Sequence, residues 1–154
     1  MKEYSEKELM NKAEAFCSAV ERCPSDVEMK LKGWGATPET MAEVMAHLFK
    51  EKYLDTIRFC SAYVRDKYRF NQWGRVKIAQ SLRIKGLSQE EINAGMENID
   101  EEEYNEILQN LLKQKQRTIK AGTDYERNAK LIRFAVGRGF AMQEILKFVK
   151  GDFE

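Results

Sequence analysis

Residues 78–96 read IAQSLRIKGLSQEEINAGM, and the glycine in the middle of this stretch, Gly86, sets the pattern for the whole chain. Apolar residues stand eight positions before it at Ile78, six positions after it at Ile92 and ten positions after it at Met96. Two segments with helical apolar spacing that meet at a glycine are typical of one helix ending at its C′ residue and a second helix following. The stretch therefore predicts a pair of helices joined by a tight glycine turn.

The same arrangement recurs around Gly35 and Gly139, which lie 51 residues before and 53 residues after Gly86. The positions that match the three apolar residues around Gly86 are again apolar: Val27, Met41 and Met45 around Gly35, and Leu131, Ile145 and Val149 around Gly139. A further amphipathic segment precedes each pair, and two of these segments share the letters FCSA, at 16–19 and 59–62. Because several positions agree in type and phase, the sequence indicates three tandem copies of a three-helix unit.

This repeat predicts an all-α protein with modules at 1–53, 54–100 and 101–154. A module of this size buries little core by itself, so we expect the three to stack into an elongated, curved rod. The expected helix starts carry cap residues: Ser5, Ser25, Ser88 and Thr123, each with glutamate three positions later, Thr37 before Pro38, and Asp55 and Asp100. The acidic run 97–106 lies at a module boundary and is a candidate pivot.

Few residues in the chain suggest catalysis or metal binding. The three cysteines, Cys17, Cys23 and Cys60, include no C-x2-C pair. We expect Cys17 and Cys60 in the core, Cys23 at a helix end, and the lone His47 packed or half-exposed on its helix. Neither a glycine-rich phosphate loop nor a nucleophile elbow is present in the sequence. The sequence predicts no enzyme activity, no cofactor and no metal.

Charge and hydropathy suggest the compartment. The chain starts MKEYSEKEL, with charges where a signal peptide needs an apolar core, and no window approaches 18 uncharged apolar residues. An odd number of cysteines fits a reducing environment better than a disulfide framework. We therefore expect a cytoplasmic protein without membrane contact, and a monomer.

Basic residues are concentrated in two blocks although the net charge is only +1. Seven lie between Arg65 and Lys85 against one acid, and eight lie between Lys113 and Arg138 against two acids. Such blocks are either solvated helix faces or binding patches for a polyanion or an acidic protein surface. Near the first block, Phe70 and Trp73 either close a corner between helices or interleave with the bases as in single-strand binders.

The middle unit, RFCSAYVRDKYRFNQWGRVKIAQSLRIKGLSQEEI at 58–92, resembles the central motif of the RecX family, the bacterial regulators of the RecA recombinase. The matching pieces are the aromatic-and-arginine helix 58–67, the Trp-Gly helix 73–87 and the Ser-x-x-Glu-Ile continuation 88–92. KLIRFAVGRGFAMQEILKFV at 130–149 is similar to the end of that family's sequences, and AFCSAVERCPSDVEMKLKGWG at 15–35 looks like their first module. Two departures are Gly137 where a double arginine is usual, and the Cys23-Pro24 corner.

The resemblance implies three tandem three-helix modules that bind the groove of a RecA–single-stranded-DNA filament and inhibit ATP hydrolysis and strand exchange, with roles in DNA repair and the SOS response. It implies no catalysis, and contact with single-stranded DNA that is indirect or weak. The residues expected to contact the recombinase or DNA are Arg65, Lys67, Arg69, Trp73, Arg75, Lys77, Arg83, Lys85, Arg133 and Arg138. The alternative is a helical nucleic-acid-binding protein that acts without a recombinase.

Overall fold

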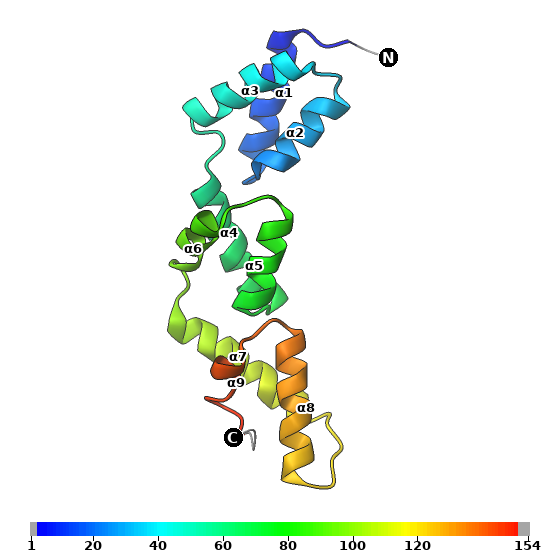
Figure 1. Ribbon diagram of the computed structural model, residues 1–154, viewed down its shortest axis with the longest axis vertical. Coiled ribbons are helices and arrows are strands. Elements are labelled where there is room, and N and C mark those ends of the chain that lie inside the picture. Colours follow the sequence, from blue (N-terminus) through cyan, green and yellow to red (C-terminus); the bar gives the residue numbers. More distant parts are fainter. Residues whose placement is uncertain (1–2, 151–154) are drawn as a thin grey trace.

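The computed structural model describes residues 3–150, and within these residues all regular structure is helical (Figure 1), which confirms the predicted all-α class. Module 1 comprises α1 (Glu6–Ala19), α2 (Pro24–Gly33) and α3 (Pro38–Lys50). Module 2 comprises α4 (Thr56–Asp66), a π-helical turn η1 (Lys67–Asn71), α5 (Arg75–Ile84) and α6 (Gln89–Met96). Module 3 comprises α7 (Glu101–Gln116), α8 (Asp124–Gly137) and α9 (Met142–Ile145). The three groups follow one another along an elongated rod (Figure 1).

The glycine turns that define the repeat are alike in all three modules. Gly35, Gly86 and Gly139 have φ angles of 87°, 90° and 95°, a left-handed conformation that a residue without Cβ adopts readily. In each turn the residue after the glycine donates its backbone N–H five residues back, as Leu87 does to the Leu82 carbonyl at 3.2 Å. These are Schellman-type helix ends, so the predicted C′ glycines are confirmed.

Most helix starts are capped as expected. Ser5 and Ser88 form complete capping boxes with Glu8 and Glu91. Side chains at four further N-caps accept a backbone N–H: Thr37, Asp55, Asp100 and Thr123. The predicted cap at Ser25 is wrong, because α2 begins two residues earlier than that cap requires, with Pro24 at its first position and Cys23 as N-cap.

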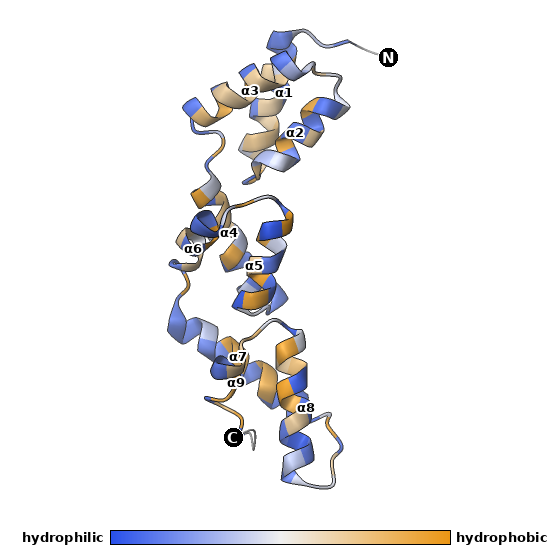
Figure 2. Cartoon of the chain, in the orientation of Figure 1, coloured by the Kyte–Doolittle hydropathy of each residue, from blue (hydrophilic) through white to orange (hydrophobic). Residues whose placement is uncertain are grey.

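The hydrophobic core has two parts. Module 1 has its own cluster, in which Leu9, Val27 and Leu48 are buried. Modules 2 and 3 share one continuous cluster, and its fully buried residues include Ile78 from α5 and Leu108 from α7. Figure 2 shows apolar residues on the inner turns of the helices in each group and hydrophilic residues on many outer turns. Modules 2 and 3 therefore form one packing unit, to which module 1 is added.

The turn η1 has no counterpart in modules 1 and 3, and the sequence did not predict it. It extends α4 by five residues and ends at Gln72, whose φ of 58° is left-handed. Tyr68 in this turn is buried, whereas Phe70 is 79% exposed. A π-helical turn widens the helix by one residue, and here it leads into Trp73 at the start of the next corner.

The middle helices of the modules follow one another along one edge of the rod (Figure 1). At the joint between modules 2 and 3, the start of α5 meets the end of α8: Gly74 N donates to the Arg138 carbonyl at 2.8 Å and Val76 N to the Gly139 carbonyl at 2.9 Å. At the joint between modules 1 and 2, the Ser25 hydroxyl of α2 donates to the Lys85 carbonyl at the end of α5, at 3.0 Å. We call these joint 2–3 and joint 1–2.

Candidate anion-binding face

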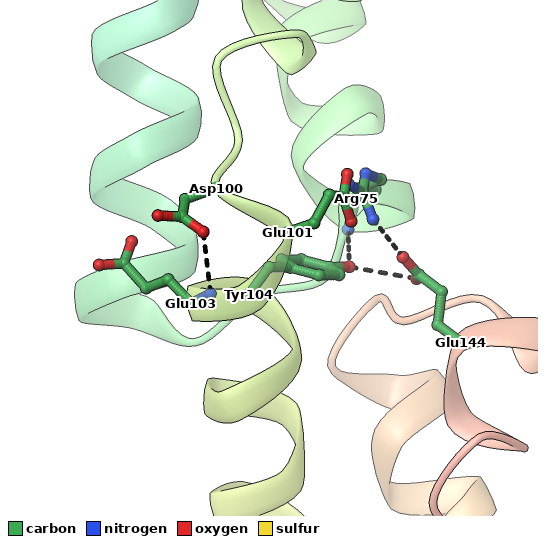
Figure 3. A network of polar contacts seen from close by, with 6 residues as sticks. All are labelled: Arg75, Asp100, Glu101, Glu103, Tyr104 and Glu144. Atoms are coloured by element: carbon green, nitrogen blue, oxygen red, sulfur yellow. Dashed lines mark hydrogen bonds and ion pairs between the residues drawn. The ribbon is translucent and has the colours of Figure 1, made fainter.

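A polar network fastens joint 2–3 (Figure 3). Arg75 Nη1 contacts Glu144 Oε2 at 2.5 Å, and its other terminal nitrogen pairs with Glu101. The Tyr104 hydroxyl accepts the Arg75 backbone N–H at 3.0 Å and donates to Glu144 Oε1 at 3.1 Å. Burial raises the pKa of Tyr104, so the phenol stays a donor. The buried Glu144 carboxylate is therefore paired with a cation from α5 and accepts a hydrogen bond from a hydroxyl of α7.

Ion pairs within the chain change the role of two arginines that the sequence assigned to partner binding. Arg75 is committed to two carboxylates of its own chain. Arg69 pairs through Nε with Glu103 at 2.7 Å, and the Tyr68 hydroxyl donates to the same carboxylate at 2.7 Å. Neither arginine is a free cation on the surface. The acidic run 97–106, which was expected to act as a pivot, supplies both Glu101 and Glu103. The first turn of α7 therefore binds module 3 to module 2 through two ion pairs.

Four other cations from the predicted set lie over aromatic rings. Lys67 and Lys77 place their Nζ atoms 5.0 and 4.6 Å from the centre of the Trp73 ring. Lys85 Nζ lies 5.8 Å from the Tyr63 ring, and Arg138 Cζ lies 5.8 Å from the Phe134 ring. All four residues are half-buried, as is usual when the stem of a long basic side chain packs against a ring.

A fifth cation of the same kind, Lys115, was not singled out from the sequence. Its Nζ lies 5.0 Å from the Phe134 ring. The sequence signal was its place in the second basic block, but only packing of α7 against α8 brings it onto Phe134. We define the basic face as these five cations with the three rings beneath them: Lys67, Lys77, Lys85, Lys115 and Arg138 over Tyr63, Trp73 and Phe134.

The two parts of the basic face meet at joint 2–3. Lys67 lies over both Tyr63 and Trp73, which links the upper part of the face to the middle. A Cβ added to Gly139 would lie 2.2 Å from the Cβ of Lys77, so the end of α8 with Arg138 lies directly against the start of α5. One face therefore carries charge from both modules.

The cations of the basic face are uncompensated. Within residues 3–150, none of the five has a carboxylate oxygen within 4 Å, whereas Arg58, Arg69 and Arg127 each pair with one carboxylate and Arg75 pairs with two. Arg138 Nε is buried and has no hydrogen-bond partner in this part of the chain. The face can therefore attract and bind anionic groups.

Trp73 packs the corner between helices, because it is half-buried against the shared core and two lysines lie over its ring. The ring is thus not open as a stacking platform for a base. Phe70 does not close the corner, since it is exposed.

The three remaining arginines of the predicted set lie apart from the basic face. Arg83 donates to Gln89 Oε1 at 2.9 Å and lines a groove of about 370 Å³ between α5 and α6. Arg65 and Arg133 are exposed. No cation–aromatic contact connects these three to the basic face among the described residues.

Catalytic and metal-binding groups were not predicted, and the described part of the chain brings together no group of three or more His, Cys, Asp or Glu side chains that could hold a metal. All three cysteines are buried, and burial raises the pKa of each thiol, to about 11 for Cys60. His47 Nε2 lies 2.7 Å from Glu14 and is half-exposed, as expected. In residues 3–150 no helix is long and apolar enough to span a bilayer.

Comparison with solved structures shows the same fold. A crystal structure of RecX from Lactobacillus salivarius matches with a TM-score of 0.82 at 16% identity, over 93% of both chains. A second structure, of a regulatory protein RecX, matches with a TM-score of 0.78 at 22% identity, over 94% of this chain and 74% of that one.

Sequence comparison gives the family. The chain is 29% identical over 131 residues to the regulatory protein RecX of Chlorobaculum tepidum, covering 83% of this chain and 79% of the relative. It is 28% identical over 149 residues to that of Escherichia coli, covering 94% and 81%. It spans only 43% of the relative from Leuconostoc mesenteroides, at 24% identity over 75% of this chain. Models of the second and third three-helix domains of RecX match residues 58–96 and 101–149, more than half of the chain. The chain therefore belongs to the RecX family of regulatory proteins.

Proposed function

We propose that this protein regulates a RecA recombinase by binding in the groove of its filament on single-stranded DNA and inhibiting ATP hydrolysis and strand exchange. Family membership and the elongated shape support this proposal. The observation that carries it is the basic face, where five cations without carboxylate partners lie across joint 2–3. A rod with one charged side can lie in a long groove and contact several partner surfaces at once.

The partner groups that suit this face are carboxylates or phosphates. An anion beside the Arg138 guanidinium would receive charge-assisted hydrogen bonds from a cation that has no carboxylate partner in residues 3–150. Lys67 and Lys77 both lie over the Trp73 ring and would add positive charge near the bound anion. Contacts of this kind weaken with salt, so the inhibition should be salt-dependent.

Charge reversal on the basic face tests the proposal. For Lys67→Glu/Lys77→Glu we expect the concentration that half-inhibits single-stranded-DNA-dependent ATP hydrolysis by RecA to rise about tenfold or more. The reason is that like-charge contacts at an interface cost several kcal/mol and about 1.4 kcal/mol is a factor of ten. The measurement is steady-state ATP hydrolysis with increasing amounts of protein.

The matched control reverses two exposed lysines of module 3 that lie outside the basic face, Lys113→Glu/Lys147→Glu. This variant has the same net charge as Lys67→Glu/Lys77→Glu, but it should inhibit like the unaltered protein. Equal inhibition by both variants would remove the basic face from the mechanism. No inhibition by the unaltered protein would contradict the proposal as a whole.

The alternative function is nucleic-acid binding without a recombinase. The cations of the basic face suit phosphates as well as carboxylates, but the Trp73 ring is covered by lysines and does not offer the stacking surface that single-strand binders use. A titration of labelled DNA without recombinase, compared with inhibition of ATP hydrolysis by RecA, separates the two functions, since tight DNA binding without inhibition favours the alternative.

A further inference from the structure

Module 1 carries a second cluster of cations over aromatic rings, outside the residues assigned above. Arg22 Cζ lies 3.8 Å from the centre of the Phe16 ring, and Lys30 Nζ lies 5.5 Å from the same ring. Lys12 Nζ lies 4.8 Å from the Trp34 ring, which meets Phe16 edge to face with the ring centres 6.4 Å apart. Three cations thus surround two touching rings on the side where α1 meets α2.

These cations are also uncompensated. Among residues 3–150, no carboxylate oxygen lies within 4 Å of Lys12, Arg22 or Lys30, and two acids of this region are engaged with other partners. Glu14 contacts His47 at 2.7 Å, and Glu21 pairs with Arg58 at 2.5 Å.

The guanidinium of Arg22 is held in a fixed position. Its Nε donates to the Phe16 carbonyl at 3.1 Å, and the group lies over the Phe16 ring. Its two terminal amino groups have no hydrogen-bond partner in the described part of the chain. A planar fork that is fixed on one side and open on the other suits bidentate contact with an anionic oxygen pair.

The repeat relates this cluster to the basic face. Lys30 lies five residues before the C′ glycine of module 1, and the equivalent residues of modules 2 and 3 are Ser81 and Phe134. Ser81 bonds to Tyr63, over which Lys85 lies, and Phe134 lies under Lys115. The contact between first and middle helix therefore carries cations on an aromatic ring in each module. The middle helices follow one edge of the rod (Figure 1), and in each module such cations lie where the first helix meets the middle helix.

We propose that this cluster, Lys12, Arg22 and Lys30 on Phe16 and Trp34, binds the phosphate backbone of a single-stranded nucleic acid. A flexible chain with one negative charge per nucleotide can follow cations spaced along a rod. Because cations cover the rings, the contact is to phosphates without base stacking, and it should not depend on base sequence. The inference deepens the proposed function by giving the filament's DNA strand its own contact on module 1.

The test is the salt dependence of binding to a labelled oligothymidylate, measured by fluorescence anisotropy with the protein alone. Arg22→Ala/Lys30→Ala should bind more weakly, and the slope of log K against log salt should fall by about 0.7 for each cation removed. Lys30 is exposed, so the single variant Lys30→Ala keeps the fold and should lose about 0.7 of the slope by itself.

The matched control is Lys32→Ala/Lys50→Ala, which removes two exposed lysines from α2 and α3 that contact neither ring. Its slope should equal that of the unaltered protein. An equal fall of the slope in both double variants would show that only net charge matters. An unchanged slope in Lys30→Ala would show that the cluster binds no phosphates. Either result overturns the proposal.

Recombinase inhibition by the same variants separates this inference from the proposed function. Loss of DNA binding in Lys30→Ala, with or without loss of inhibition, supports the phosphate site. Unchanged DNA binding with weakened inhibition would overturn it and make an acidic protein surface the partner of module 1. Inhibition that is absent even in the unaltered protein contradicts the proposed function only, because the DNA titration contains no recombinase.

Discussion

Two glycines at joint 2–3 show how much a single carbon atom can matter in this molecule. A Cβ on Gly74 would lie 2.4 Å from the backbone carbonyl carbon and oxygen of Gly139 and from Phe140 N. These are backbone atoms, and the Gly139 oxygen accepts the Val76 N–H of the joint, so they cannot move aside without disturbing that hydrogen bond. Gly137, the last residue of α8, has nothing within 4 Å of its Cβ position.

These surroundings predict opposite effects of the same substitution. Gly74→Ala should lower the free energy of unfolding by about 2 kcal/mol or more, because overpacking against backbone forces modules 2 and 3 apart. Gly137→Ala should raise it by up to about 1 kcal/mol, because alanine is the better helix former and meets no obstacle. Urea unfolding followed by circular dichroism measures both. Equal effects would mean that the close approach at joint 2–3 does not limit stability.

Residue roles at this scale were predictable where they depend on local spacing. The C′ glycines and most caps follow from neighbours within four residues, and they were found. The role of Arg75 was not predictable, because its partner Glu144 lies 69 residues away. In the sequence Arg75 is one more base in a basic block, and only the fold places a buried carboxylate opposite it.

At the scale of the helices, the start of α6 is held by a complete capping box. Glu91 accepts the Ser88 backbone N–H at 2.9 Å, and Ser88 Oγ accepts the Glu91 N–H at 3.1 Å. Hydrogen bonds from the Thr56 hydroxyl and then from Ser88 lower the pKa of Glu91 below its ordinary value. Since Thr56 begins α4, the carboxylate also ties α6 to the first helix of its module.

This contact predicts a pH-dependent difference between the protein and Glu91→Gln. A carboxyl group whose pKa is lower in the folded state contributes stability fully above its ordinary pKa of about 4.5, and loses it as the pH falls through the folded-state value. The melting temperature of Glu91→Gln should therefore be lower at pH 7 and approach that of the unaltered protein as the pH falls below about 4.5. Melting curves from pH 7 to pH 3 measure this, and a constant difference would contradict it.

Helix boundaries were predicted wrongly at two places where a residue of the helix bonds to another element. Ser25 has the sequence of a cap, but its hydroxyl donates to Lys85 of the next module. The turn η1 has no sequence signature, since its wide turn depends on burying Tyr68 against α7 and bonding its hydroxyl to Glu103. In both cases a contact from outside the helix competes with its local preference.

At the scale of the whole molecule, the two joints are related by the repeat but differ in strength. Joint 2–3 has two backbone hydrogen bonds, the Arg75–Glu144–Tyr104 network and a shared hydrophobic core. Joint 1–2 has the Ser25–Lys85 bond, the Glu21–Arg58 pair and Cys23 packed against the module 2 core. Pro24 is the repeat equivalent of Arg75, but it has no backbone N–H and cannot form a bond like the one from Arg75 N to the Tyr104 hydroxyl. An open groove of about 360 Å³ lies beside the Glu21–Arg58 pair.

This difference predicts that module 1 moves against a rigid unit of modules 2 and 3. Spin labels at Glu39→Cys and Gln80→Cys should give a wider distance distribution than labels at Gln80→Cys and Asn110→Cys, which span joint 2–3. All three positions are exposed. Double electron–electron resonance measures both pairs, and distributions of equal width would contradict a hinge at joint 1–2. The native thiols are buried with raised pKa values and should label slowly.

The sequence by itself determined the all-α class, the three-fold repeat, the glycine turns and most of the caps, because each depends on the periodicity or chemistry of residues close together in the chain. All five cations of the basic face lie within its two basic blocks, although Lys115 was not singled out there. Only the tertiary structure decided which of those cations are free and which are paired, since Glu101, Glu103 and Glu144 reach them from other helices. Charge compensation is a property of distances in space, and no spacing along the chain records it.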